Sequence, residues 1–298
     1  MSAVSTPRPE AAASGGAGRA GRRRRRSGVV DKPRWLALVT GATLLFLSAP
    51  LVVIAVFSFN SSSSLSDFDK PSLRWYQTLA ENDGIQESLV TSLTIAGATT
   101  LLALALGTGL AFAFTRGKKR VTRPIQATTL MTLVTPEIAT AIGLLTLFTT
   151  MGVPLSTTTL ILGHVTFALV YVTVIVGGRL QLLSRDLEEA GMDLGATELQ
   201  TFRLVVLPQL APALAGAGLL VFVLSFDDFV TSLFLSGTEV APLPVRIYGM
   251  LRFGLTPEVN AIGTLMMVAS VGLGVVGLWA VNRRGRRRFS VTDSHTTV

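Results

Sequence analysis

The stretch Ser184–Pro208, with the sequence SRDLEEAGMDLGATELQTFRLVVLP, is a polar interruption between two long apolar segments. Connections between helices are usually only a handful of residues long, but this one has about two dozen. Apolar positions recur at helical spacing on both sides of Gly195, a residue type that permits a sharp change of chain direction. The stretch therefore predicts two short helices that meet at a glycine elbow.

Both ends of this stretch carry signals of their own. Asp186, Glu188 and Glu189 at its start are suited to the N-terminus of the first short helix. Pro208 is expected to end or kink the second short helix, where the next apolar segment begins.

The elbow is predicted to expose three apolar side chains, those of Leu194, Ala196 and Leu199. Exposed apolar residues on a polar connection are typical of a surface that binds a partner protein. The alternative is an ordinary amphipathic linker that lies on a membrane surface.

Long apolar segments flank this stretch and account for most of the chain. Of the 298 residues, 49% are hydrophobic and only 15% are charged, whereas about a quarter are charged in soluble domains. A hydrocarbon core about 30 Å thick needs roughly 20 apolar residues in a helix. Six segments reach that length: 35–59, 88–115, 125–150, 157–183, 209–236 and 259–281. We therefore predict an all-α, polytopic membrane bundle of six transmembrane helices over residues 35–283.

The basic residues lie almost entirely on one side of this predicted bundle. The net charge is +8, and 22 of the 26 Lys and Arg residues fall in the two tails, in the second and fourth connections, or, as Arg179 and Arg283 do, at the adjoining ends of the apolar region. The positive-inside rule then places both termini in the cytoplasm of a bacterial cell. Residues 1–34 are predicted to be a disordered basic tail that contacts anionic lipid rather than nucleic acid, and residues 284–298 a cytoplasmic C-terminal tail.

Motifs typical of enzymes and cofactor-binding proteins are absent or misplaced. The chain has no cysteine, which excludes disulfides and thiol chemistry, and it has no G-x-x-x-x-G-K-[ST] sequence for binding ATP. The G-x-G-x-x-G run from Gly272 to Gly277 lies within the sixth apolar segment, where glycines favour close helix packing over dinucleotide binding. His164 has no acidic neighbour in the fourth segment, and we expect it to make a hydrogen bond between helices.

Three acidic residues lie deep within the apolar segments. Glu137 is near the middle of the third segment, and Asp227 and Asp228 are in the outer half of the fifth. A charged residue at the centre of a helix costs at least ~2.5 kcal/mol to insert, so these acids should line a protein interior or a wet cavity. Acids in such a path favour cations over sulfate, phosphate or neutral sugars.

Two further features bear on these acids. Pro136 is expected to open the helix beside Glu137 and to free a backbone carbonyl as a further cation ligand. Adjacent residues on a regular helix point about 100° apart, so Asp227 and Asp228 should differ in role. One of them would face the path, and the other would cap a broken helix or pair with a basic residue.

The polar stretch also resembles a known family. Its spaced residues are similar to the E-A-A…G-A…I-x-L-P loop of ABC importer permeases: Glu189, Ala190, Gly191, Gly195, Ala196, Val205, Leu207 and Pro208. Gly191 stands where the family pattern has a second alanine. The resemblance implies the type I ABC importer permease fold, with residues 184–208 as a coupling loop that docks on a separate ATPase subunit. It also implies that this chain is not an enzyme and binds no cofactor, because ATP and Mg²⁺ would bind to the ATPase.

Within that family, the chain looks most similar to spermidine/putrescine permeases. The stretches that carry this likeness are 73–76, 135–138, 225–230, 243–248 and 257–261. The resemblance implies an importer of polyamines in the bacterial plasma membrane. It further implies that the chain pairs with a second, different permease and works with an extracytoplasmic solute-binding protein. The candidate residues of the substrate pathway are Glu137, Asp227, Asp228, Phe226 and Tyr248.

Two other functions remain open from the residues alone. An ABC importer permease of the same fold could carry another small solute. An ion-coupled secondary transporter also uses intramembrane acids and broken helices, although such transporters usually show internal repeats and more spans. The loop at 184–208 favours the importer, because a secondary transporter would not need it.

Overall fold

The computed structural model describes residues 34–63, 67–237, 241–253 and 257–289, and it describes the backbone alone at 34, 253, 278 and 280–289. Contacts within the chain divide it into two units, Met1–Ser48 and Ala49–Val298. The described residues are mainly helical and contain no strand, apart from a single antiparallel bridge between Asn60 and Pro71. The predicted all-α class is confirmed.

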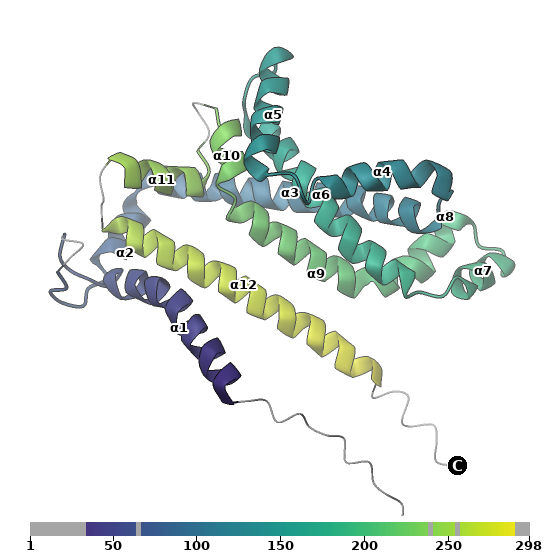
Figure 1. The fold of residues 1–298 in the computed structure, drawn as a ribbon, viewed down its shortest axis with the longest axis horizontal. Helices are drawn as coiled ribbons and strands as arrows, with labels where there is room; N and C mark the ends of the chain where they lie inside the picture. Colours follow the sequence, from purple (N-terminus) through teal and green to yellow (C-terminus); the bar gives the residue numbers. More distant parts are fainter. Residues whose placement is uncertain (1–33, 64–66, 238–240, 254–256, 290–298) are drawn as a thin grey trace, which may run out of the picture. The chain divides into compact units, whose positions relative to one another are not determined.

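The helical elements carry the labels of Figure 1, except η1, which is a π-helical turn between α8 and α9. In chain order they are α1 Arg34–Phe57, α2 Arg74–Glu81, α3 Asp83–Arg116, α4 Lys119–Met131, α5 Glu137–Thr150, α6 Thr157–Gln181, α7 Asp186–Asp193, α8 Glu198–Thr201, η1 Phe202–Val206, α9 Leu207–Phe226, α10 Val230–Leu235, α11 Leu243–Phe253 and α12 Glu258–Phe289.

Most of the predicted spans correspond to long helices. Within the described residues, five helical runs are long and apolar enough to cross a membrane: Trp35–Phe57, Asp83–Arg116, Thr157–Gln181, Glu198–Phe226 and Glu258–Gly277. The shorter apolar helix α5 lies in the third predicted segment. The third and fifth segments differ from the other four, because each contains a break.

The third apolar segment is broken between α4 and α5. Helix α4 ends at Met131, and a turn at 132–136 precedes the start of α5 at Glu137. Pro136 has ψ at 130°, outside the helical range, and it lacks the N–H group that a continuous helix would use. The predicted opening at Pro136 is confirmed. Glu137 therefore lies in the first turn of a helix, directly after the break near the middle of the third apolar segment.

The fifth apolar segment is broken at Asp227–Phe229. Helix α9 ends at Phe226, and α10 begins at Val230. The Oδ2 atom of Asp228 accepts a hydrogen bond from the backbone N–H of Ser232 at 2.9 Å, which satisfies a free N–H group at the start of α10. Asp228 therefore caps a broken helix, as expected of one of the two aspartates, but Asp228 also lines the cavity described below, so the predicted division of roles between the two is corrected.

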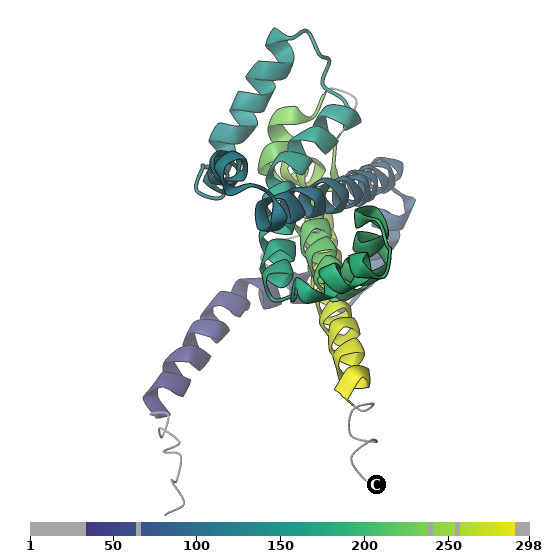
Figure 2. The same ribbon diagram turned by 90° about the vertical axis from the view of Figure 1, so that its right-hand side faces the viewer.

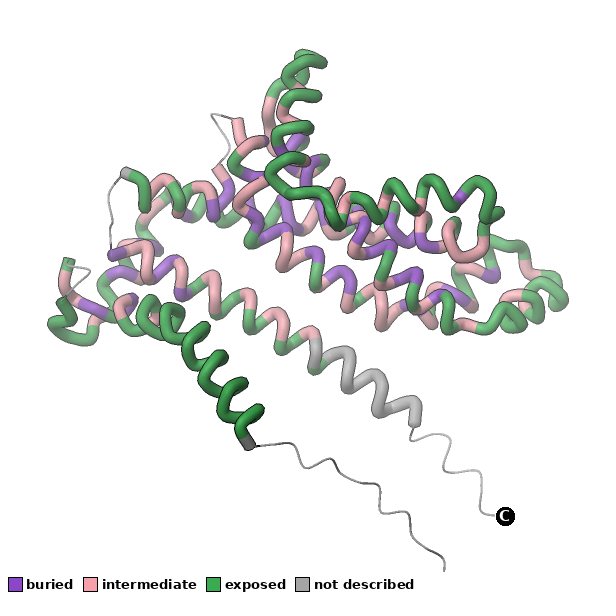
Figure 3. Tube along the Cα trace, in the orientation of Figure 1, coloured by how far each residue is buried: buried purple, intermediate pink, exposed green. Residues whose placement is uncertain are grey.

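The core of the second unit lies where α3, α6 and α9 pack against one another (Figures 1 and 2). Many of the buried residues lie along these three helices (Figure 3). Small residues allow the close approach, since a Cβ atom added to Gly107 of α3 would lie 2.7 Å from the Cβ atom of Val172 on α6. Close packing of this kind drives helix association in lipid, where apolar burial alone contributes little.

Helix α12 packs against α9 and α2. A Cβ atom added to Gly277 would overlap the side chain of Leu219, so this glycine is placed directly against α9. Nothing lies within 4 Å of the corresponding positions at Gly272 and Gly274. The packing interpretation of the G-x-G-x-x-G run is therefore confirmed at one of its three glycines.

The boundaries of the predicted tails are only partly covered. Helix α12 continues to Phe289, beyond residue 283, the predicted end of the transmembrane domain. Residues 290–298 of the predicted C-terminal tail and residues 1–33 of the predicted N-terminal tail lie outside the described residues.

Candidate functional site

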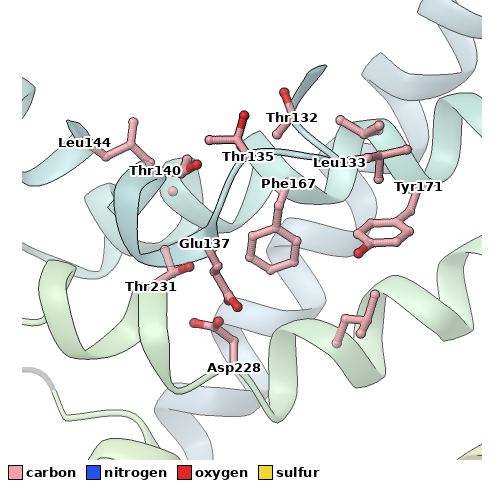
Figure 4. Close-up of a pocket in the computed structure, with 13 residues that line it drawn as sticks. Thr132, Leu133, Thr135, Glu137, Thr140, Leu144, Phe167, Tyr171, Asp228 and Thr231 are labelled. Atoms are coloured by element: carbon pink, nitrogen blue, oxygen red, sulfur yellow. The ribbon is translucent and has the colours of Figure 1, made fainter. Parts of the chain in front are cut away.

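A cavity of about 270 Å³ lies between the two helix breaks (Figure 4). The turn at 132–135 and the first half of α5 form one wall, and the face of α6 from Gly163 to Tyr171 forms another. Leu224, Asp228 and Thr231, around the second break, complete the lining. Because each break ends a helix inside an apolar segment, polar groups reach the cavity there instead of being enclosed in regular helix.

Glu137 and Asp228 face each other in this cavity. Their carboxyl groups point toward one another from the start of α5 and from the turn before α10 (Figure 4). Two carboxylates in this arrangement repel each other, and the low dielectric constant of a protein interior makes the repulsion stronger than in water. A cation between them would relieve the repulsion, and an ammonium group would donate charge-assisted hydrogen bonds to both. The arrangement therefore suits a ligand that carries positive charge.

Asp228 is held in place by His164 of α6. The Nε2 atom of His164 lies 3.2 Å from Asp228 Oδ2 and 3.2 Å from the hydroxyl oxygen of Ser232 on α10. Its Nδ1 atom lies 2.7 Å from the hydroxyl oxygen of Ser225 on α9. His164 is 1% exposed, so these contacts replace the ones that water would make. The predicted hydrogen bond of His164 between helices is confirmed.

The two adjacent aspartates have different surroundings. Asp228 lines the cavity and is 8% exposed. Asp227 instead accepts a bond from the Ser270 hydroxyl of α12, at 2.9 Å to Oδ2 and 3.1 Å to Oδ1, and it is not among the residues that line the cavity. One aspartate therefore faces the cavity, while its neighbour ties the end of α9 to α12.

The two aromatic candidates lie away from the cavity. Phe226 is buried in a cluster with residues of α2 and α12, and its ring stacks on that of Phe222 with the centroids 6.3 Å apart. Tyr248 of α11 is 40% exposed, and its ring centroid lies 4.9 Å from that of Phe229. Of the five predicted pathway residues, the structure brings together two, Glu137 and Asp228.

The cavity offers ligands for an organic cation rather than for a metal ion. Within the part of the chain that the structure describes, no three or more His, Cys, Asp or Glu side chains gather as metal ligands would. Two carboxylates accompanied by hydroxyl groups instead match the hydrogen-bond donors of an ammonium group.

Sequence reasoning missed the hydroxyl groups of this cavity. They belong to Thr132, Thr135, Thr140, Tyr171 and Thr231. The Thr135 hydroxyl donates to the carbonyl of Met131 at 2.9 Å, so its oxygen presents lone pairs to a ligand. The available signal was the cluster of threonines that precedes Pro136 in the sequence.

The polar stretch 184–208 folds as two short helices that meet at Gly195. This glycine has φ at +90°, a conformation that residues with a Cβ atom rarely adopt, and it lies between α7 and α8. Leu194 and Leu199 are 91% and 75% exposed, whereas Ala196 is half-buried. The predicted elbow and its two exposed leucines are confirmed, and the exposure predicted for Ala196 holds only in part.

Pro208 does not end the second short helix before the fifth apolar segment, so that half of the prediction is corrected. One helical run extends through α8, η1 and α9, from Glu198 to Phe226. The π-helical turn η1 ends at Val206, and Pro208 follows in the first turn of α9. The wider turn changes the local hydrogen-bond pattern, which accommodates the missing N–H group of proline without a break.

Gly191 lies at the contact between the two short helices. A Cβ atom added to it would lie 3.3 Å from the Thr201 hydroxyl oxygen, so the glycine allows α7 to pack closely against α8 and η1. Its neighbours Glu189 and Ala190 are exposed. The motif is completed by Val205 in η1 and by Leu207 at the start of α9.

Arg116 at the end of α3 ties the elbow to the core. Its Nη2 and Nε atoms donate to Glu188 Oε1 at 2.7 and 3.0 Å. Nη2 also lies 3.4 and 3.3 Å from the carbonyl oxygens of Leu180 and Leu183 at the end of α6. Both charged side chains are at most 15% exposed. The sequence indicated Arg116 only as one of many basic residues, and nothing in it pointed to this pair.

A family model and two similar proteins point to the same family of transport proteins. A family model described as "Binding-protein-dependent transport system inner membrane component" matches residues 103–289. The putrescine transport system permease protein PotI of Escherichia coli (strain K12) is 36% identical over 268 residues, which cover 88% of this chain and 95% of that protein. The spermidine/putrescine transport system permease protein PotC of Haemophilus influenzae is 36% identical over 231 residues, which cover 78% of this chain and 90% of that protein.

Solved structures share the fold. A bacterial ABC transporter involved in the import of the acidic polysaccharide alginate matches with a TM-score of 0.63 and 17% identity, over 84% of this chain and 95% of that chain. The MetNI methionine ABC transporter, in an inward-facing conformation, matches with a TM-score of 0.57 and 18% identity, over 71% of this chain and 98% of that chain. At these identities the likeness establishes the fold, and it is the predicted fold of an ABC importer permease.

Proposed function

This chain belongs to the family of inner-membrane components of binding-protein-dependent transport systems, and from that premise we propose that it is the permease subunit of an ATP-driven importer of polyamines. Its relatives are transport permeases, and its apolar helices are long enough to span a membrane several times. It is therefore a multi-pass membrane protein that takes part in solute transport.

The observation that carries the substrate proposal is the pair of facing carboxylates at Glu137 and Asp228. A polyamine carries several ammonium groups, and each loses strong hydration when it leaves water. Negative charge and oxygen acceptors compensate for that loss, and the cavity supplies both. An anion would be repelled by the same two acids, and a neutral sugar would leave their charge unpaired.

The relatives support this substrate class, because PotI and PotC are permease proteins of putrescine and spermidine/putrescine transport systems. The fold alone does not indicate a substrate. Of the two solved structures, one is involved in importing an acidic polysaccharide and the other transports methionine. The acid pair inside the cavity, together with sequence similarity, is what favours a cation.

We place the energy source on another subunit: ATP and Mg²⁺ bind to a separate ATPase, which docks on the elbow formed by α7 and α8. The exposed Leu194 and Leu199, on both sides of the turn at Gly195, support this docking surface. The residues assigned to ATPase coupling are Glu189, Ala190, Gly191, Gly195, Ala196, Val205, Leu207 and Pro208.

The proposed orientation has both termini in the cytoplasm. It is supported by the 22 basic residues on one side of the spans and by the contact of Arg116 with Glu188, which puts a basic connection and the elbow at the same end of the bundle. The remaining proposed partners are a second, different permease chain and an extracytoplasmic solute-binding protein.

Uptake by the complete complex in liposomes tests the substrate. We expect ATP-dependent uptake of radiolabelled putrescine or spermidine. Glu137→Gln and Asp228→Asn should each lower it by about tenfold or more, because a charge-assisted contact contributes about 1.5–3 kcal/mol. Asp227→Asn is the matched control, since its carboxylate lies outside the cavity.

Complex assembly and polyamine binding by the solute-binding protein should not change in any of these variants. Wild-type uptake by both cavity variants would show that the acid pair is not in the path. ATP-dependent uptake of another solute, with no uptake of polyamines, would show that the substrate is wrong.

A further inference from the structure

A second cavity, of about 320 Å³, lies along the same face of α6 as the first. Phe167 and Val170 line the first cavity, and Val174, Gly177 and Gln181 line the second. These positions follow one another at intervals of three and four residues, the spacing of a single helix face. The two cavities are therefore consecutive along one groove.

The α4 segment borders both cavities as well. Gln126 and Thr129 of α4 line the second cavity, and the turn at 132–135 that follows this helix lines the first. On α6, the lining of the first cavity ends at Tyr171 and that of the second begins at Thr173, so the second cavity follows directly after the first. The second cavity is thus a separate location, nearer to the basic end of the bundle.

The second cavity has both polar and apolar walls, and none of the residues that line it carries a charged side chain. Its hydrogen-bonding side chains are those of Thr115, Thr129, Thr173, Gln126 and Gln181. All three threonine hydroxyls donate to the carbonyl four residues earlier, at 2.7, 2.8 and 2.7 Å. A hydroxyl whose proton is already donated offers only its oxygen to a ligand. All five side chains therefore supply oxygen acceptors without negative charge, and the two glutamine amides can also donate.

From this arrangement we infer that the second cavity is an inner binding site for the ammonium groups of the substrate, which they reach after leaving Glu137 and Asp228. The inference rests on the proposed function, because it requires a cationic substrate. An ammonium group has three donors and no acceptor, so it matches threonine hydroxyl oxygens and glutamine amide oxygens. The three threonine hydroxyl groups already donate their protons to backbone carbonyls, so they cannot donate to an anion.

A neutral site in this position also helps the cationic substrate to leave the transporter on the inner side. Hydrogen bonds between an ammonium and a carboxylate are roughly twice as strong as those between neutral partners, so the acid pair holds the cation more tightly than hydroxyls and amides do. Conduction requires sites that bind well enough to admit a cation and weakly enough to let it go. The order found here, from acids to neutral oxygens, satisfies both requirements for inward movement.

The double variant Gln126→Leu and Thr129→Val tests this site by removing two acceptors at nearly constant volume. The matched control is Thr128→Val, because Thr128 is the exposed neighbour of Thr129 and its hydroxyl makes the same kind of bond, to the Pro124 carbonyl at 3.0 Å, outside the cavity. In the complete complex, we expect the double variant to lower the maximal polyamine uptake rate about tenfold, with little change in the half-saturating concentration. The control should transport at the wild-type rate.

Protection from a thiol reagent supplies a readout that does not depend on transport. The native chain has no cysteine, so Thr129→Cys and Thr128→Cys each introduce a single reactive position. In inverted membrane vesicles that carry the complete complex, putrescine should slow the reaction of Thr129→Cys with a positively charged thiol reagent. The reaction of Thr128→Cys should not change.

The outcomes separate this inference from the proposed function. Normal uptake by the double variant, together with no protection of Thr129→Cys, overturns the inner site and leaves the acid pair and the substrate untouched. Failure of the wild-type complex to take up any polyamine overturns the proposed substrate itself.

Discussion

The guanidinium group of Arg116 lies 2.7 Å from the carboxylate of Glu188 and joins the end of α3 to the first helix of the elbow. The same group contacts two carbonyls at the end of α6, so three separate elements meet at one side chain. Helices α3 and α6 also belong to the packed core, and α6 lines both cavities. A force applied to the elbow by a bound ATPase would therefore reach the cavities through this contact.

Replacing Glu188 with glutamine should weaken this link. The isosteric amide keeps the volume but removes the charge, and a hydrogen bond to a charged group contributes about 1.5–3 kcal/mol. We expect fewer polyamine molecules transported per ATP hydrolysed, with normal membrane insertion, as measured by parallel uptake and ATPase assays in liposomes. Asp186→Asn is the control, because Asp186 is exposed in the same helix and its carboxylate accepts a hydrogen bond from the nearby Ser184 hydroxyl. An unchanged transport ratio in Glu188→Gln would contradict this role.

The elbow at Gly195 should not tolerate proline. Its φ of +90° is far from the value near −65° that proline requires, so Gly195→Pro must reshape the turn. We expect this variant, and Glu189→Lys, to retain less ATPase in pull-down experiments and to lose uptake at normal permease levels. Gly216→Ala is the control, because this helical glycine has open space around it. If both elbow variants retain the ATPase and transport at wild-type levels, the assignment of the elbow to ATPase coupling is wrong.

The features that could be predicted from sequence depend on signals within one segment. Long apolar runs predicted the spans, and the acids, glycine and apolar spacing of 184–208 predicted the two helices and their turn. Pro136 predicted an opening for the same reason, since a proline restricts its own backbone. The prediction that Pro208 ends the second short helix was wrong, because the π-helical turn before it accommodates the proline. No signal in the sequence indicates that turn.

The site itself depends on contacts between segments that are distant in sequence. His164, Glu137 and Asp228 come from three different apolar segments, and only the packing of α5, α6 and α10 brings them together. Phe226 and Tyr248 were candidates because they lie in stretches that resemble polyamine permeases, but a shared stretch does not fix the direction of a side chain. The adjacent Asp227 and Asp228 show this directly, since they contact different helices.

The proposed orientation predicts which positions an impermeant thiol reagent can reach. Ser62→Cys should be labelled in intact cells, or in spheroplasts where an outer membrane is present, because residues 60–87 are assigned to the outside. Ser290→Cys should be labelled only after the membrane is opened, since both termini are assigned to the cytoplasm. The native chain contributes no background because it has no cysteine. The reverse labelling pattern would show that the chain has the opposite orientation in the membrane.

The contact of His164 with Asp228 predicts a coupled loss of stability and transport. His164 is 1% exposed, and its removal in His164→Ala leaves Asp228 without one of its buried partners. An unsatisfied buried group costs about 1–3 kcal/mol, and more if it is charged, so the purified complex should melt at a lower temperature. Uptake should fall as well, because Asp228 is then free to turn away from Glu137.

Two further variants show whether this effect is specific to the contact. His164→Gln can still donate one hydrogen bond through its amide, and it should recover part of both losses. Thr166→Val removes a hydroxyl on the same helix that donates to the Leu162 carbonyl, and it should change neither quantity. A His164→Ala complex with the wild-type melting temperature and uptake would show that the imidazole does not hold Asp228. A lower melting temperature with wild-type uptake per folded complex would limit His164 to a structural role, because the carboxylate would then keep its place without it.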